Sequence, residues 1–383
     1  MNIALVAPWH APHHGGLQRH VRELARGLVR RGAAVEVLSQ EYGPGLPRVS
    51  QLDGVVVRRF SGAGHGARFA VTPTLSEYLR RTADSFDLVH VLCAHPLLAL
   101  VAARAHPRRL VFSPLAPMER LLRWPYGRAT RAVVYRAAQT ICACRAEADL
   151  LRRALPAAAD RVRVVREGVD VAAIRSAKPF STDDAVVLTV GRLARDKRVD
   201  RVIATMPGLA PGFELVVIGD GPARRRLRSF AADLRVSSCV RFAGRVPDSD
   251  LYRWLSTARV LVTLSQLESS GLPVLEGIAA GAPVVASDIP AHREAASFAR
   301  GIGVTFVSPE GSPLEVADAI FHACGVRRPA TQAPLPTWAD VVNTTLALYQ
   351  GRMPGRLITD GRHRLGKPCT WEGDGRPDVA VND

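Results

Sequence analysis

The amino-acid sequence predicts an α/β protein with two Rossmann-like domains that face a central cleft. The prediction rests on three features. Short apolar runs alternate with helical patterns, the alternation pauses at a polar segment near residues 176–184 and restarts, and the glycine-rich loops directly follow apolar runs. Strands separated by helices are typical of a parallel sheet covered on both faces, and such sheets bind ligands beyond the carboxyl ends of their strands.

The first half of the chain contains five predicted strands and one long helix. In the helix, residues 17–31, Val21, Leu24 and Leu28 recur on one face, and arginines from Arg19 to Arg30 recur on the other. This pattern predicts an amphipathic helix whose arginines point outward. The strands are predicted at residues 3–7, 35–39, 55–60, 88–92 and 110–113.

The second half repeats this pattern after a linker. Residues 176–184 are rich in Ser, Asp and other polar residues, so we place the first domain at 1–175 and the second at 176–337. A helix at 338–349 follows, and the tail 351–383, rich in Gly, Pro, Arg and Asp, is expected to be disordered. The strands are predicted at residues 186–190, 215–218, 240–242, 260–264 and 284–286.

The composition indicates an ordinary globular chain. Its 383 residues suffice for two domains, no apolar run reaches the length of about 18 residues that a membrane span needs, and the first residues lack a basic signal segment. The six cysteines are scattered without a Cys-x-x-Cys pair, which argues against a zinc site or a disulfide framework. We therefore expect a cytoplasmic protein.

The net charge of +16 is concentrated in the N-terminal half. Residues 1–175 carry 26 Lys and Arg against 13 Asp and Glu, whereas residues 176–350 carry 19 against 17. A basic half is typical of a surface that meets an anionic partner, such as the inner face of an anionic membrane. Only three of the 51 basic residues are lysine, so a codon bias toward arginine explains the excess equally well.

The most informative segment runs from Glu268 to Glu276 and reads ESSGLPVLE. It follows an apolar strand and passes through a glycine into a helix, whose free N–H groups and positive dipole end suit a phosphate. Glu268 would lie at the reactive end, and Glu276, about one turn into the helix, would accept hydrogen bonds from a sugar diol. Taken alone, an exposed loop glutamate and a glutamate of an amphipathic helix explain the pair as well as a ligand site does.

Two further loops follow predicted strands directly. Gly15 and Gly16 open the first helix and would let the backbone approach a diphosphate, although a Gly-Gly turn is common. The three histidines just before Gly15 have no carboxylate or cysteine at a spacing that would complete a metal site. Arg192 and Lys197 would bind a diphosphate as a planar fork and a point charge, with surface cations on a loop as the alternative.

Together, these segments resemble family 4 of the retaining glycosyltransferases, which have the GT-B fold. The resemblance extends over about residues 1–350. The matching segments are GGLQRHV at 15–21, DLVH at 87–90, EGVD at 167–170, GR with DK at 191–197, GDGP at 219–222, and the Glu-x7-Glu segment through GAPVVAS at 281–287.

The resemblance implies roles for the predicted site residues, and it implies that the last helix crosses back onto the N-terminal domain. Those that would take part in catalysis, by contacting the donor diphosphate or the donor sugar, are Arg192, Lys197 and Glu268. Those that would bind the nucleotide and its phosphates are Gly15, Gly16, Ser269, Ser270, Gly271, Leu272 and Glu276. No cofactor is expected, because the nucleotide diphosphate sugar is a co-substrate.

The Asp248-Ser249-Asp250 sequence matches the Asp-x-Asp pattern with which some sugar transferases bind a divalent cation. It precedes a helical pattern, however. We therefore interpret Asp248 as the N-cap of that helix and Asp250 as a residue of its first turn, and we predict no metal site.

The sequence departs from the family pattern at three places. Leu115 stands where a histidine usually reaches the donor sugar near its 6-hydroxyl, Ser270 replaces an aromatic residue, and Arg166-Glu167 replaces Pro-Asn. An apolar side chain at the 6-position would favour a donor that lacks this hydroxyl, which is a 6-deoxyhexose or a pentose.

We therefore predict a retaining, metal-independent glycosyltransferase that moves a hexosyl, 6-deoxyhexosyl or pentosyl group to an unidentified acceptor, without a nucleic-acid partner. Two alternatives remain open. One is a nucleotide-sugar epimerase on the same fold. The other is a basic protein that binds a membrane surface or nucleic acid and has a degenerate sugar site. Its candidate contact is Arg120, Arg123, Arg128, Arg131 and Arg136 around Trp124 and Tyr126.

Overall fold

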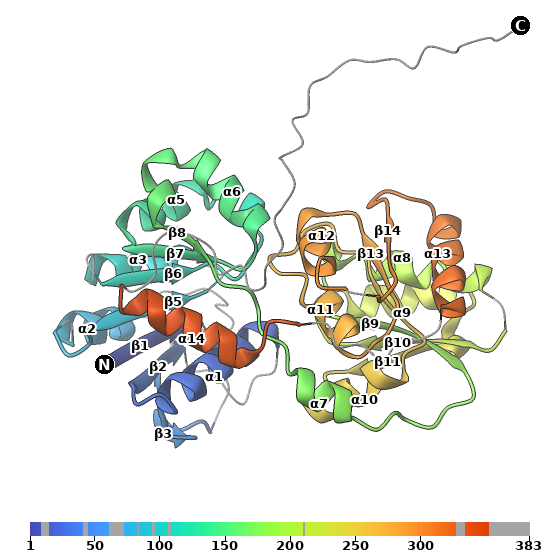
Figure 1. Ribbon diagram of the computed structural model, residues 1–383, viewed down its shortest axis with the longest axis horizontal. Helices are drawn as coiled ribbons and strands as arrows, with labels where there is room; N and C mark the ends of the chain where they lie inside the picture. Colours follow the sequence, from blue (N-terminus) through green and yellow to red (C-terminus); the bar gives the residue numbers. More distant parts are fainter. Residues whose placement is uncertain are drawn as a thin grey trace, which may run out of the picture.

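The computed structural model describes residues 1–8, 15–40, 45–60, 73–82, 84–93, 96–105, 109–123, 125–209, 211–299, 301–326 and 334–351. Over these ranges the chain forms two α/β domains that lie side by side (Figure 1). The histidines at 10, 13 and 14, Trp124, and the tail from residue 352 lie outside the described residues.

An eight-stranded sheet forms the N-terminal domain, in the order β3-β4-β2-β1-β5-β6-β7-β8. Its neighbouring strands are parallel except for β3 and β4. The five predicted strands are present, and the short strands β3, β7 and β8 were not predicted. The strands are β1 (Asn2–Ala7), β2 (Ala34–Gln40), β3 (Val49–Leu52), β4 (Val55–Phe60), β5 (Leu88–Leu92), β6 (Leu110–Ser113), β7 (Gln139–Cys142) and β8 (Val162–Val164).

Helices cover both faces of this sheet. On one face α1 buries Val21, Leu24 and Leu28 in a core with strand residues such as Ile3, which confirms the predicted amphipathic helix. The other face is covered by the remaining helices of the domain. The helices are α1 (Gly16–Val29), α2 (Pro73–Arg81), α3 (Pro96–Ala105), α4 (Met118–Leu121), α5 (Gly127–Arg136) and α6 (Arg145–Ala154).

A six-stranded, fully parallel sheet forms the C-terminal domain, in the order β11-β10-β9-β12-β13-β14. The predicted strands of this half are present, and β14 was not predicted. The strands are β9 (Ala185–Val190), β10 (Phe213–Ile218), β11 (Val240–Gly244), β12 (Val260–Thr263), β13 (Val284–Ser287) and β14 (Val304–Val307).

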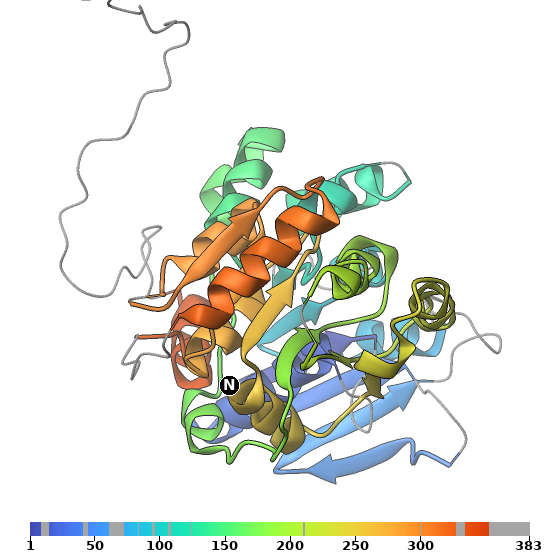
Figure 2. The ribbon, with the colours of Figure 1, turned by 90° about the vertical axis from the view of Figure 1, so that its right-hand side faces the viewer.

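The C-terminal sheet is also covered on both faces. One core holds side chains of α7, α10, α11 and α12, and the other holds those of α8, α9 and α13. Figure 2 shows α13 crossing the outer face of this domain. The helices are α7 (Val171–Ser176), α8 (Val199–Ile203), α9 (Arg224–Asp233), α10 (Asp248–Thr257), α11 (Leu272–Ala279), α12 (Pro290–Ala296) and α13 (Pro313–Gly325); short 3-10 turns are η1 (Pro156–Arg161), η2 (Arg195–Lys197), η3 (Met206–Gly208) and η4 (Ser237–Cys239).

The last helix, α14 (Trp338–Tyr349), lies on the N-terminal domain beside α1 (Figure 1). Its Val341, Val342 and Leu348 belong to the same core as α1. The sequence predicts a helix here, at about residues 338–349. A capping box between Thr337 and Asp340 stabilises its start.

Two chain segments cross between the domains, and they pair with each other. The backbone N–H of Val169 donates to the carbonyl oxygen of Pro336 at 2.9 Å, and Val169 forms a parallel bridge with Thr337. Ile174 of α7 is buried in the core of the C-terminal domain, although the boundary drawn at residue 175 assigned it to the N-terminal one. No helix in the described parts of the chain is long and apolar enough to span a membrane.

Candidate functional site

Loops after β9, β10 and β12 meet at the carboxyl ends of the C-terminal strands, where such sheets bind ligands. The backbone N–H of Leu193 donates to the carbonyl oxygen of Asp220, and that of Gln266 donates to the carbonyl oxygen of Asp196. Gly219 permits this close approach, because its φ is 129° and a Cβ atom would lie 1.8 Å from the carbonyl oxygen of Gly191.

Lys197 and Glu268 form an ion pair between these loops. The Nζ atom of Lys197 donates to Oε1 of Glu268 at 2.6 Å, and the hydroxyl of Ser265 donates to the same oxygen at 2.8 Å. Burial raises the pKa of Glu268, but the charge of Lys197 and the hydrogen bonds from Lys197 and Ser265 outweigh burial and lower this pKa below its usual value. The carboxylate is therefore ionised at neutral pH.

A buried serine and histidine support this ion pair. The hydroxyl of Ser287 donates to the carbonyl oxygen of Ser265 at 2.5 Å, and Nδ1 of His292 lies 2.9 Å from the carbonyl oxygen of Ser287. Because a carbonyl oxygen only accepts, Nδ1 of the ring carries a hydrogen. Burial lowers the pKa of His292, so the ring is neutral at pH 7. Sequence reasoning missed Ser265, Ser287 and His292, because single polar residues in apolar elements form no pattern.

Arg192, the second predicted cation, is not joined to Glu268. Its guanidinium lies 3.7 Å from the carboxylate of Asp196, and its side chain is 56% exposed. It directly follows β9, in the same loop as Lys197. The structure therefore brings Lys197 and Glu268 together and leaves Arg192 exposed.

The helix after Glu268 begins at the predicted glycine. Gly271 is the N-cap residue of α11 and has a left-handed backbone, with φ of 65°. Ser269 and Ser270 come just before it and are partly exposed, and Leu272 is the first helical residue. The free N–H groups and the positive dipole end of α11 thus lie a few residues from Glu268.

Glu276 lies one turn inside α11 and is buried against the other domain. Nη1 of Arg19 in α1 donates to Oε1 of Glu276 at 2.6 Å, and Nη2 of Arg19 donates to Asp248 at 2.8 Å. Arg22 donates to the second oxygen of Asp248 at 2.7 Å. Arg19 and Arg22 were predicted to point outward from α1, but they contact the C-terminal domain.

The N-cap prediction for Asp248 is wrong. Helix α10 begins at Asp248 itself with Pro247 as its N-cap residue, and no side chain caps it. The carboxylate binds α1 across the interface instead. Burial raises the pKa of Asp248, but Arg19 and Arg22 outweigh burial and lower it. Among the residues that the structure describes, no group of three or more His, Cys, Asp and Glu side chains has the geometry to hold a metal ion.

The predicted glycine pair lies at the start of α1. Gly15 is the N-cap residue, Gly16 is the first helical residue, and a Cβ atom on Gly16 would meet nothing within 4 Å. The backbone N–H of Arg19 donates to the carbonyl oxygen of Gly15 at 2.9 Å. The glycine pair therefore precedes, by one helical turn, the arginine that binds Glu276.

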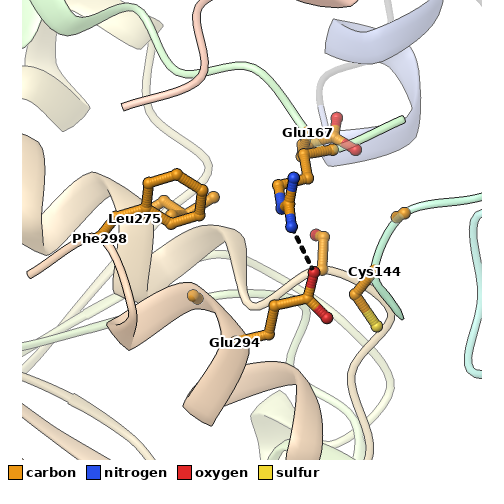
Figure 3. A pocket seen from close by; sticks show the side chains of 9 residues that line it. Cys144, Glu167, Leu275, Glu294 and Phe298 are labelled. Atoms are coloured by element: carbon orange, nitrogen blue, oxygen red, sulfur yellow. Dashed lines mark ion pairs between the residues drawn. The ribbon is translucent and has the colours of Figure 1, made fainter. Parts of the chain in front are cut away.

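A small pocket lies between the domains next to Ser270. Its wall includes an ion pair between Arg166 and Glu294, with 3.2 Å between nitrogen and oxygen, which Figure 3 marks with a dashed line. Both domains contribute the residues labelled in Figure 3, which are Cys144, Glu167, Leu275, Glu294 and Phe298.

Arg166 and Glu167, which depart from the family pattern, both have partners at this interface. Glu167 lies 2.9 Å from Nδ1 of His20. Glu294, the partner of Arg166, also accepts a hydrogen bond from the backbone N–H of Arg145 at 2.6 Å. A carboxylate of the C-terminal domain therefore lies at the N-terminus of α6 in the N-terminal domain, where the helix dipole favours negative charge.

Leu115, the third departure, follows β6 with a φ of 46°, which is uncommon for a residue other than glycine. Its partly buried side chain packs against the core that the first sheet shares with α1 and α14. Its proposed position near the donor sugar remains a prediction.

The two α/β domains have mainly parallel sheets and are connected by two chain segments that pair with each other. The candidate ligand loops follow strands of the C-terminal domain. This arrangement defines a GT-B protein. The family model described as Glycosyltransferase Family 4 matches residues 14–173, and the model described as Glycosyl transferases group 1 matches residues 170–320. The chain is 30% identical over 336 residues to the glycogen synthase of Mycobacterium tuberculosis, which covers 77% of this chain and 80% of that protein. The chain belongs to the family 4 glycosyltransferases with the GT-B fold.

Two further proteins are similar over most of the chain. The D-inositol 3-phosphate glycosyltransferase 1 of Catenulispora acidiphila is 29% identical over an alignment that covers 89% of this chain and 92% of that protein. The crystal structure of Anabaena HepE in complex with UDP-glucose has a TM-score of 0.66 and 19% identity, over 91% of this chain and 95% of that chain. At this identity the likeness to HepE shows the fold alone.

Proposed function

We propose that this glycosyltransferase moves a sugar from a nucleoside diphosphate sugar to an acceptor hydroxyl with retention of configuration. The proposal rests on the ion pair between Lys197 and Glu268, which lies just before the N-terminus of α11. In the reaction the bond between sugar C1 and the diphosphate oxygen breaks and leaves its electron pair on the diphosphate. The acceptor oxygen then bonds to C1 on the same face, and the hydroxyl proton passes to the departing diphosphate.

The charge that develops on the diphosphate needs electrostatic stabilisation. Lys197 supplies it from η2, and Arg192 supplies it from the same loop once the donor is bound. The N–H groups of α11 near Gly271 and Leu272 complete the phosphate site, with Gly15 and Gly16 from the other domain. Such groups act on the transition state, where the charge is greatest, and this raises the rate.

The two glutamates recognise the rest of the donor. The Oε1 atom of Glu268 already accepts hydrogen bonds from Lys197 and Ser265, which leaves Oε2 for a sugar hydroxyl. Glu276 accepts hydrogen bonds from the ribose diol. The cations and the helix dipole take the place of a metal ion, so the reaction is metal-independent.

A donor screen on the full chain tests this proposal. UDP-glucose is the first donor to test, since the similar HepE structure holds it, followed by ADP and GDP sugars in a thermal-shift assay. Donors that stabilise the protein are then tested for slow hydrolysis, with the anomer of the released sugar identified by NMR and with a chelator present. Hydrolysis with inversion, or activity that only a divalent cation restores, would reject this mechanism.

The epimerase alternative receives less support. It requires acid and base groups that face the sugar, whereas Glu268 is paired with a lysine and accepts from Ser265. The matched family models and named relatives are glycosyltransferases, which also favours transfer. Sugar transfer is therefore the proposed reaction.

The N-terminal domain presents a basic surface that fits a cytoplasmic protein peripheral to the inner face of an anionic membrane. On α4, α5 and the segment between them the arginines are exposed, and Tyr135 is 44% exposed beside them. The surface consists of Arg120, Arg123, Arg128, Arg131 and Arg136. On this proposal it holds the enzyme near an acceptor in or at the membrane.

A further inference from the structure

Arg19 joins the two halves of the proposed donor site. It lies one turn into α1, after Gly15 and Gly16, and its guanidinium crosses the interface to Glu276 in α11. The side chain of Arg19 is 13% exposed and that of Glu276 is 3% exposed, so water screens this ion pair little. The contact therefore has a large electrostatic effect on Glu276.

The contact with Arg19 favours the charged form of Glu276. Burial raises the pKa of Glu276, and the neighbouring carboxylates of Asp248 and Glu167 raise it further. Arg19 opposes this rise through its charge and its hydrogen bond. Even with Arg19 present the pKa of Glu276 stays above its usual value, and loss of Arg19 would raise it further.

Arg19 is itself held in place by the C-terminal domain. One oxygen of Asp248 accepts from Nη2 of Arg19, and Arg22 binds the other oxygen, so Asp248 links both arginines. The guanidinium also lies 5.8 Å from the ring centroid of Tyr252. These contacts keep Arg19 beside Glu276 when a ligand binds. They argue against the alternative that the ribose displaces Arg19 from Glu276.

We propose that Arg19 is a positioning residue of the donor site, which keeps the carboxylate of Glu276 charged and oriented for the ribose diol. The inference rests on the proposed role of Glu276. It adds that ribose recognition requires a side chain of the other domain, so nucleotide binding depends on the contact between α1 and α11.

Calorimetry with UDP, ADP and GDP on the full chain tests the inference at about pH 6 and about pH 8.5. For the nucleotide that binds best, Arg19→Gln is expected to weaken binding tenfold or more at the lower pH. At the higher pH a larger fraction of the unpaired carboxyl is ionised, so the loss should be smaller. The ratio of variant to wild-type affinity cancels the titration of the nucleotide phosphate.

Two matched variants separate charge from structure. Arg19→Lys keeps a cation beside Glu276, so its binding ratio should change little with pH. Arg26→Gln lies on the same helix but pairs with Glu23 and Asp53 of its own domain, so it should bind like the wild type. A melting curve for each variant shows that it is folded.

The outcomes distinguish this inference from the proposed function. If the wild type binds a nucleotide and Arg19→Gln binds it equally well at both pH values, the positioning role is wrong. Tighter binding by Arg19→Gln would overturn it too, because Arg19 would then compete with the ribose. If the wild type binds none of the three nucleotides, the donor site itself is rejected and this inference with it.

Discussion

His90 in β5 and Tyr349 at the end of α14 lie 2.5 Å apart, from Nδ1 to the phenol oxygen, although 259 residues separate them in the chain. The other ring nitrogen of His90 lies 2.7 Å from the hydroxyl of Ser113. His90 is fully buried, and burial first and His20 second lower its pKa to about 3. A neutral histidine therefore ties the last helix to the N-terminal sheet.

This site predicts a loss of stability in mild acid. Below about pH 6.5 the unfolded chain takes up a proton on His90 that the folded protein excludes, so the free energy of unfolding falls by about 1.4 kcal/mol per pH unit from this group. The fall continues toward the folded pKa of about 3. Chemical unfolding at several pH values between about 5 and 7 gives the free energy of unfolding as a function of pH. This free energy should fall less steeply with decreasing pH in His90→Gln than in the wild type. Equal slopes would contradict the account.

The local parts of the fold and site could be predicted from the sequence. Helix α14, Trp338–Tyr349, lies where the sequence predicts a last helix, at about residues 338–349. The short strand β7 was missed because its sequence, QTIC, opens with two polar residues and forms no apolar run. The contact of Arg19 with Glu276 joins residues 257 positions apart, so no local pattern contains it. Asp248 was misread for the same reason, since its partners lie in the other domain.

The phosphate cations give a prediction about catalysis. Lys197→Ala and Arg192→Ala are each expected to lower kcat/KM by about 10²–10³, since each removes a donor to the developing charge. Lys197→Ala should also raise the KM for the donor, because Glu268 is left buried without its cation. Arg175→Ala, at the end of α7, is the control. Steady-state kinetics with a fixed acceptor measure both effects, and near wild-type turnover in both variants would rule out this phosphate site.

Glu294 gives a prediction about the domain interface. A carboxylate at a helix N-terminus contributes about 0.3–2 kcal/mol, and Glu294 supplies it to α6 from the other domain. Glu294→Ala should therefore speed hydrogen exchange of the amides of Arg145 and Ala146 by several fold. Asp149→Ala, an exposed residue of α6 that pairs with Arg152, is the matched control. Equal protection in Glu294→Ala and wild type would mean that the interface opens freely.

The basic surface of α4 and α5 predicts binding to anionic vesicles. The full chain should sediment with vesicles rich in phosphatidylglycerol at low salt and should be released as the salt concentration rises. Combined replacement of Arg128, Arg131 and Arg136 by Gln should weaken this binding, and the same replacement at Arg225, Arg226 and Arg228 of α9 should not. If the protein does not sediment with the vesicles at low salt, codon bias toward arginine remains as the explanation of the basic excess.

Leu115 gives a prediction about donor choice. A hydroxyl that faces an apolar side chain loses its partner at a cost of about 1–3 kcal/mol, so a donor that lacks the 6-hydroxyl should be preferred. Matched pairs of donors, a hexose and its 6-deoxy form on the same nucleotide, measure this preference as a ratio of kcat/KM. Leu115 has a left-handed backbone, which histidine adopts more readily than leucine, so Leu115→His should fold. It should shift the preference toward the hexose, and a wild-type enzyme that prefers the hexose tenfold would reject the idea.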